Sequence, residues 1–175
     1  MNEQKVVLRH VSTEDLDCLV VLMREMQVDD PWSCEFTDHG AREAAQNLVR
    51  DPSLGRIWMI CLDQEIVGYI VLSFDYSLEY GGKCGWVDEF FVRKEHRGRG
   101  IGSQALDFFS DRARELGART VHLGVRRGNP AIDLYRRAGF REHDAYVMTK
   151  WLRKRDESAP AGAETLFQAK PERLG

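Results

Sequence analysis

The sequence is poor in cysteine, and the cysteines it has do not form the pattern of a metal site or a disulfide framework. Cys18, Cys34, Cys61 and Cys84 lie far apart, form no CxxC pair and have no histidine at metal-ligand spacing. We therefore expect reduced thiols in a cytoplasmic protein that binds no metal.

Long apolar runs and an excess of positive charge are also lacking. No stretch approaches the roughly eighteen apolar residues of a membrane span. The N-terminus MNEQKVVLRH is charged and has no apolar segment of the kind found in signal peptides. The formal net charge of −3 does not favour nucleic acid as a partner. The sequence thus predicts neither membrane insertion nor nucleic-acid binding.

The composition that remains is typical of a globular protein. Of the 175 residues, 43% are hydrophobic and 30% are charged, which is enough for one domain with a sizeable core. After residue 153 the chain becomes polar, rich in Ala and Pro, and loses its periodicity. We predict one domain over residues 1–153 and a mobile tail over residues 154–175.

Hydrophobic periodicity predicts helices and strands in the order β, α, α, β, β, β, α, β, α, β. Ser12 or Thr13 is expected to cap the first helix, and Pro52 and Gly117 to follow the second and third. Hairpins mixed with crossovers imply an α/β sheet with parallel and antiparallel pairs. Strands are expected over residues 5–11, 56–62, 65–74, 86–92, 119–125 and 145–152.

A basic, glycine-rich segment, FFVRKEHRGRGIGSQAL, joins a predicted strand to a predicted helix at residues 90–106. The first N–H groups of a helix lack internal partners and attract anions. Gly98, Gly100 and Gly102 would let a ligand approach the backbone, and Arg97 and Arg99 add donors suited to phosphate. The segment therefore indicates a pyrophosphate-bearing ligand, with a solvated glycine-rich turn as the alternative.

Two familiar phosphate loops do not fit this segment. A Walker A loop needs Gly-Lys followed by Ser or Thr, which occurs nowhere in the chain. A dinucleotide fingerprint needs a glycine where Ser103 stands and an acid at the end of the next strand, where VRRG stands. What remains is R-x-x-G-x-G, from Arg97 to Gly102.

In this motif the sequence resembles the GNAT superfamily of acetyl-CoA-dependent N-acetyltransferases. VDEFFVRKEHRGRGIGS is similar to the diamine acetyltransferase branch, and NPAIDLYRRAGF resembles the family's second motif. The resemblance covers most of residues 5–152. It implies a mixed, mainly antiparallel α/β sheet of about six to seven strands with about four helices, whose splayed central strands form a cleft for CoA.

The resemblance also assigns acetyl-CoA to particular residues, with the strand backbone binding pantetheine and the loop binding pyrophosphate. Asn129 lies one place after the family's asparagine, where this chain has Gly128, so it either contacts acetyl-CoA or caps the helix near Pro130. The residues expected to bind acetyl-CoA are Phe90, Phe91, Val92, Arg97, Gly98, Arg99, Gly100, Ile101, Gly102, Ser103, Asn129 and Tyr135.

Tyr135 falls on the family's tyrosine, which implies that it protonates the departing CoA thiolate; the alternative is a packing residue. An amine nucleophile must lose a proton, which calls for a carboxylate. Asp88 and Glu89 are adjacent on a strand, so simple alternation would turn them to opposite faces. Alternation places Asp88 on the same side as Phe90, and the resemblance to the diamine acetyltransferase branch implies an acidic residue at this position. Asp88 is therefore favoured as the base, with Glu89 in reserve. Both acids could instead only attract the substrate cation.

Acidic and aromatic residues occur together in the segments expected to wall the acceptor site. They suit a cationic amine through charge and cation–π contact. We therefore expect the acceptor to be a small amine, such as a polyamine, amino sugar or amino acid derivative. We expect the acetyl group to pass to it directly in a ternary complex, and the resemblance implies a homodimer. A protein lysine or N-terminus, or a non-catalytic acetyl-CoA-binding module, are the alternatives. The residues expected to bind the acceptor are Trp32, Glu35, Tyr80 and Asp88.

Overall fold

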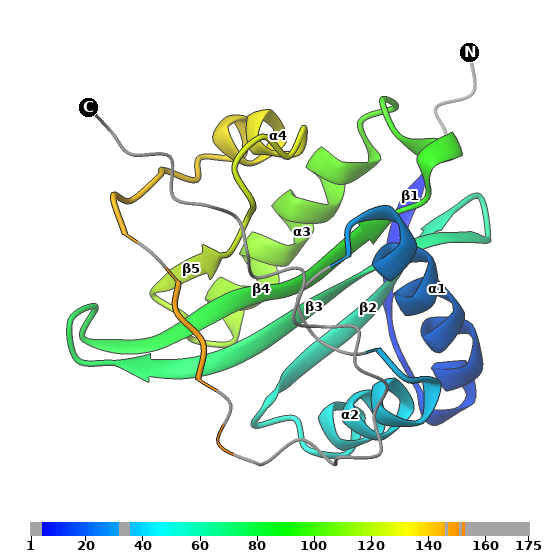
Figure 1. Cartoon of the computed structure of the whole chain (residues 1–175), viewed down its shortest axis with the longest axis horizontal. Coiled ribbons are helices and arrows are strands. Elements are labelled where there is room, and N and C mark those ends of the chain that lie inside the picture. The colour runs from blue at the N-terminus through cyan, green and yellow to red at the C-terminus, as the bar shows by residue number, and fades with distance from the viewer. Residues whose placement is uncertain (1–4, 32–35, 146, 151, 153–175) are drawn as a thin grey trace.

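The computed structural model describes residues 5–31, 36–145, 147–150 and 152. One twisted sheet runs through the middle of the molecule, with helices packed on both of its faces (Figure 1). Within the described residues no helix is both long and apolar enough to cross a membrane. The expected tail, residues 154–175, lies outside the described residues.

The sheet has five strands in the order β1-β2-β3-β4-β5, and the order in space follows the order in sequence. The first four pair antiparallel, and β5 joins β4 in parallel. Asp63 and Gln64 form the predicted two-residue hairpin, and both have positive φ, as such turns require. The strands are β1 (Val6–His10), β2 (Gly55–Leu62), β3 (Glu65–Ser77), β4 (Gly82–Val92) and β5 (Thr120–Leu123).

The helices begin where the sequence provides caps. Ser12 and Asp15 form a capping box at a short 3-10 turn that leads into α1, and Thr37 Oγ1 accepts the Gly40 N–H at the start of α2. α3 follows Gly100, which has a φ of 79°. The helices are α1 (Leu16–Asp29), α2 (Asp38–Arg50), α3 (Ile101–Glu115) and α4 (Ile132–Arg137).

Alternation along the strands divides the core into two layers, one on each face of the sheet. On one face, Leu19 and Leu22 of α1 pack with Met59 and Tyr69. On the other, Leu106 and Phe109 of α3 pack with Trp58, Ile70 and Leu72, and the partly buried Leu134 and Tyr135 of α4 join this layer. The helix pair α1 and α2 and the helix pair α3 and α4 therefore flank opposite faces of the sheet (Figure 1).

The predicted α/β class and mainly antiparallel sheet are confirmed, but the predicted strand over residues 145–152 is wrong. The described residues of this segment have no regular structure, so the described sheet has five strands and not six or seven. Val147, Met148 and Leu152 are 76%, 91% and 89% exposed. A strand needs both a pairing partner and a buried face, and these three apolar side chains are exposed.

Candidate active site

The pairing between strands β4 and β5 ends partway along β4. Their pairing runs from Cys84 opposite Thr120 to Val87 opposite Leu123, where β5 ends. β4 continues to Val92 and stays paired on its other edge with β3. From residue 88 on, β4 therefore has no strand partner on the β5 side within the described residues. An open strand edge offers its N–H and C=O groups to an extended ligand.

The open edge leads directly into the glycine-rich loop and the start of α3. Gly98 and Gly100 have φ of 75° and 79°, which an L side chain rarely adopts. No heavy atom lies within 4 Å of a Cβ built on Gly98, so the backbone there is accessible to a ligand. A loop of this shape at a helix start can hold an anion with its N–H groups.

The Arg97 side chain is already engaged within the protein. Its Nε donates to the Val92 carbonyl at 2.7 Å, and its guanidinium forms an ion pair with Asp29 at the end of α1. Lys94 also pairs with Asp29, at 2.6 Å. The Val92 carbonyl, expected to contact pantetheine, thus accepts a hydrogen bond from Arg97. Arg97 is placed to shape the loop, which makes the loop's main-chain groups the stronger candidates for anion binding.

Gly102 brings α4 close to the glycine-rich loop. A Cβ at this position would lie 3.0 Å from Leu134 Cδ2 and 3.7 Å from Phe90 Cζ. Glycine therefore allows α3, α4 and β4 to meet at one point. Tyr135 follows Leu134, so this contact fixes Tyr135 relative to the open edge.

Tyr135 is partly buried. Its ring lies 5.9 Å from that of Phe140 in an edge-to-face arrangement, and burial raises its pKa above the usual value for a phenol. A raised pKa keeps the hydroxyl protonated at neutral pH. The side chain can therefore act as a proton donor.

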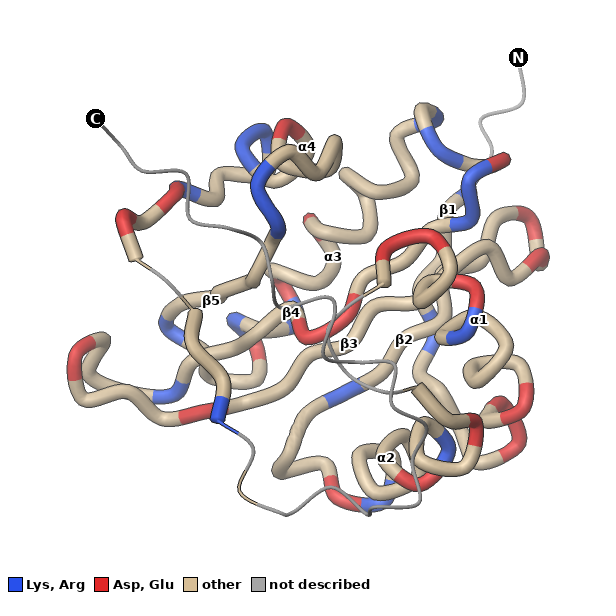
Figure 2. The backbone as a smooth tube through the Cα atoms, in the orientation of Figure 1, with Lys and Arg blue, Asp and Glu red and all other residues tan. Residues whose placement is uncertain are grey.

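The two adjacent acids of β4 do not follow simple strand alternation, which corrects the expectation from the sequence. Val71 pairs with Glu89 and Leu72 pairs with Val87, so Asp88 is an extra residue in a β-bulge. The negative charge of the neighbouring Asp88 contributes to the raised pKa of Glu89. The bulge interrupts the alternation on which the expected orientation of the two acids was based. Figure 2 shows this acidic stretch partway along β4.

Glu89 is held by a residue that the sequence gave no reason to select. The hydroxyl of Tyr69, on the neighbouring strand β3, donates to Glu89 Oε2 at 2.8 Å. Burial raises the pKa of Glu89 above the usual value for a carboxyl group. Partial removal from water also raises the pKa of Asp88, although this residue keeps an exposed surface. Raised pKa values strengthen carboxylates as bases.

Asn129 caps the helix, as one of its two expected roles requires. Its Oδ1 accepts the Ala131 N–H at 2.8 Å, just before α4. Its Nδ2 donates to Asp30 Oδ2, also at 2.8 Å, and Arg126 forms an ion pair with the same carboxylate. The end of α1 is thereby tied to the loop between β5 and α4.

The expected acceptor residues are only partly described. Trp32 and Glu35 lie outside the described residues. Tyr80 packs against His122 with ring centroids 4.8 Å apart, over the part of β4 that is still paired with β5.

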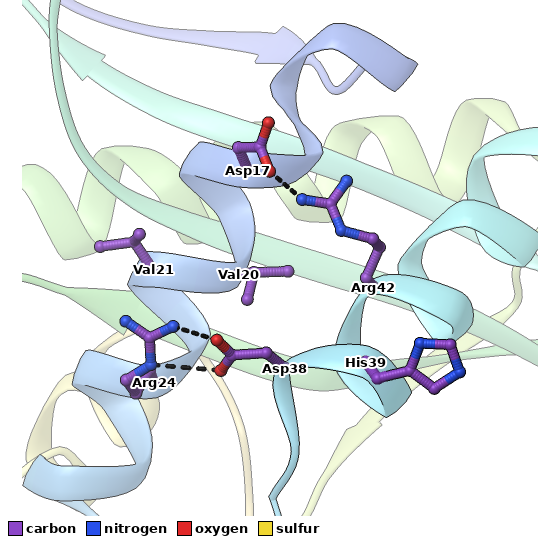
Figure 3. A pocket seen from close by; sticks show the side chains of 7 residues that line it. All are labelled: Asp17, Val20, Val21, Arg24, Asp38, His39 and Arg42. Carbon is purple, nitrogen blue, oxygen red and sulfur yellow. Dashed lines mark hydrogen bonds and ion pairs between the residues drawn. The ribbon is translucent and has the colours of Figure 1, made fainter.

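A hollow of about 410 Å³ lies elsewhere, between α1 and α2. Two ion pairs cross it, from Arg24 to Asp38 and from Arg42 to Asp17 (Figure 3). None of its lining residues is a predicted site residue. The lining residues are Asp17, Val20, Val21, Arg24, Asp38, His39 and Arg42.

Replacing Gly100 by alanine is expected to weaken acetyl-CoA binding about five- to tenfold. Alanine at a φ of 79° costs about 1 kcal/mol or more, and relief of this strain would turn the loop N–H groups. Titration calorimetry with acetyl-CoA and a thermal melt measure the two effects. Gly117→Ala is the matched control, since Gly117 has a φ of 89° with open space around it at the other end of α3. Equal losses of acetyl-CoA affinity in both variants would contradict the prediction.

The site thus has an open strand edge, a glycine-rich loop at the end of that edge, and the partly buried Tyr135 on the helix that approaches Gly102. An arrangement of this kind can bind an extended, anionic ligand. The family described as Acetyltransferase (GNAT) family matches residues 21–140. The aminoalkylphosphonate N-acetyltransferase of Salmonella typhimurium is 30% identical over 136 residues, covering 77% of this chain and 84% of the relative.

Solved structures agree with the family match. An integron cassette protein from the mobile metagenome of Cole Harbour Salt Marsh has a TM-score of 0.74 at 36% identity, covering 83% of this chain and 90% of the other. A protein from Clostridium acetobutylicum, described as a predicted acetyltransferase and solved with acetyl-CoA, has a TM-score of 0.70 at 18% identity. It covers 83% of this chain and 96% of the other, and at this identity the likeness supports the fold.

The chain belongs to the GNAT family of acetyltransferases. The resemblance drawn from the R-x-x-G-x-G and NPAIDLYRRAGF motifs is confirmed, and so is the class of acetyl-CoA-dependent N-acetyltransferase. The roles of the individual site residues stay predictions.

Proposed function

We propose that the protein transfers the acetyl group of acetyl-CoA to the primary amine of a small molecule, by direct attack in a ternary complex. The observation that carries the proposal is the open edge of β4 beyond Val87, which ends at the glycine-rich loop. Phe90 to Val92 would hold the pantetheine arm, and residues 97–103 the pyrophosphate. Acetyl-CoA supplies the activated acyl group.

The chain's own side chains would move the protons. Glu89 and Asp88 lie at the start of the open edge, where a carboxylate can take a proton from an ammonium group. Tyr135, whose pKa is raised by burial, would give a proton to the departing sulfur. Both acids also favour a cationic acceptor by charge.

The acceptor class is supported by the site and by a relative. The Salmonella typhimurium relative is an aminoalkylphosphonate N-acetyltransferase, and aminoalkylphosphonates are small amines. A protein lysine or N-terminus is the second candidate, and a non-catalytic acetyl-CoA-binding module the third. A homodimer and a cytoplasmic location stay predictions.

The test is release of free thiol from acetyl-CoA with a panel of acceptors. The panel contains aminoalkylphosphonates, polyamines, aminoglycosides, amino acids and lysine peptides. Turnover with one small-amine class, well above hydrolysis, supports the proposal. Turnover confined to lysine peptides would favour the second candidate, and tight acetyl-CoA binding without turnover would favour the third.

We expect no acetyl group on any cysteine during turnover. Cys61 and Cys84 are buried in the core, and a thioester on either would require the core to open. Acid quenching with radiolabelled acetyl-CoA, followed by peptide mapping, checks this. Label on Cys18, which is partly exposed, or on another thiol at a rate that matches turnover, would replace direct transfer by an acyl-enzyme route.

A further inference from the structure

Tyr69 places a hydroxyl group inside an otherwise apolar layer. Its side chain is 0% exposed, and it packs among the residues between the sheet and α1. The hydroxyl lies 2.8 Å from Glu89 Oε2 and 3.3 Å from the sulfur of Met26. A phenol has one proton to donate, and a carboxylate is a far stronger acceptor than a thioether. The proton therefore points to Glu89.

The scaffold holds this hydroxyl in place. Tyr69 pairs with Phe91 across β3 and β4, and their rings lie 6.3 Å apart on the same face of the sheet. Next to it, a Cβ on Gly68 would lie 2.1 Å from the Phe91 carbonyl oxygen, so the strands approach closely here. A tyrosine buried in such packing has one available rotamer. Glu89 thus meets a donor at a fixed position.

The bulge at Asp88 explains why Glu89, and not Asp88, reaches that donor. If Asp88 were paired with Val71 and not bulged, Glu89 would pair with Ile70 and would turn to the other face of the sheet, away from Tyr69. Asp88 stays at the exposed side, where it can attract a cation. The two adjacent acids therefore differ in their surroundings.

We propose that Tyr69 is a positioning residue, which fixes the Glu89 carboxylate at the open edge so that Glu89 accepts the proton of the amine. The inference rests on the proposed function. Glu89 takes one proton from the ammonium, and the freed nitrogen forms a bond to the acetyl carbon. The C–S bond breaks with its electron pair going to sulfur, which takes the Tyr135 proton. The acetylated nitrogen then loses its second proton to the Tyr135 phenolate, which becomes a phenol again, and Glu89 releases its proton to water.

Two substitutions next to Glu89 are expected to shift its pKa in opposite directions. Tyr69 on β3 lowers the pKa of Glu89 by donating a hydrogen bond, whereas the negative charge of Asp88 on β4 raises it. From α1, Met26 is uncharged, and Glu25 is engaged with Arg93 at 2.8 Å. Tyr69→Phe should therefore raise the pKa of Glu89, and Asp88→Asn should lower it.

The experiment compares wild type, Tyr69→Phe, Asp88→Asn and the control Tyr76→Phe, whose tyrosine lies on the same strand but is 74% exposed. The pH dependence of kcat/KM is measured with acetyl-CoA and the best acceptor of the panel. In Tyr69→Phe we expect the acidic limb to move to higher pH and kcat/KM below its midpoint to fall about tenfold. In Asp88→Asn the limb should move to lower pH.

A second readout does not require turnover. Carbon-13 labelling of the glutamate carboxyl groups follows the titration of Glu89 by NMR in each variant, with Glu89→Gln assigning its signal. A titration midpoint that rises in Tyr69→Phe and falls in Asp88→Asn supports the hydrogen bond from Tyr69 to Glu89. This result would stand even if no acceptor of the panel were acetylated and the proposed function were wrong. An unchanged Glu89 midpoint in a folded Tyr69→Phe variant overturns the inference. So does an unchanged acidic limb in an active enzyme.

Discussion

Tyr135→Phe is expected to lower kcat about 10²–10³-fold and to change the dissociation constant of acetyl-CoA by less than about twofold. The ring of Tyr135 packs against Phe140 and stays in place in the variant. Only the hydroxyl is lost, and with it the proton for the departing sulfur. Thiol release at saturating acceptor measures kcat, and calorimetry measures acetyl-CoA binding.

The pH profile separates an acid from a packing residue. Burial raises the pKa of Tyr135, so the proton is present at neutral pH and is lost only well on the basic side. Any basic limb of kcat that Tyr135 causes should therefore disappear in the phenylalanine variant. A variant with normal kcat and a lower melting temperature would show that Tyr135 serves packing alone.

The part of the site that the sequence predicted is the part encoded locally. Positive φ and the absence of a Cβ are properties of single glycines, so RGRGIG already indicated where Gly98 and Gly100 would form a loop before a helix. The helix start is likewise a local signal, and Ser12, one of the two expected caps, takes part in the capping box before α1. Residues 90–106 could therefore be interpreted without knowledge of what packs against them.

The part that could not be predicted depends on pairing between distant segments. The bulge at Asp88 exists only in relation to Val71 and Leu72 of β3, and nothing in VDEFF reveals it. Tyr69 appears in EIVGYIVLSF as one more strand residue, and its role becomes visible only once Glu89 lies opposite its hydroxyl. The expected strand over residues 145–152 failed for the same reason, since alternation cannot supply a partner.

Glu89→Gln is expected to lower kcat/KM at neutral pH by about 10²–10⁴-fold, the usual contribution of a general base. Glutamine keeps an oxygen that can accept the Tyr69 hydroxyl, so the packing around it is retained. Because the pKa of Glu89 is raised, wild-type activity should fall as the pH drops through that raised value. The variant should lack this acidic limb and regain rate at high pH, where the amine loses its proton to water. Asp88→Asn should retain most of kcat and raise KM for a cationic acceptor.

Glu89→Gln is expected to leave the melting temperature of the protein unchanged or to raise it. The folded state raises the pKa of Glu89, so it binds this proton more tightly than the unfolded chain does. Stability therefore falls as the pH rises from the unfolded to the folded pKa, and this loss persists at neutral pH. Glutamine carries no such charge and avoids it. A variant that loses activity without losing stability is typical of a residue retained for chemistry. The base would instead be Asp88 if Glu89→Gln lost both activity and melting temperature while Asp88→Asn was inactive but stable.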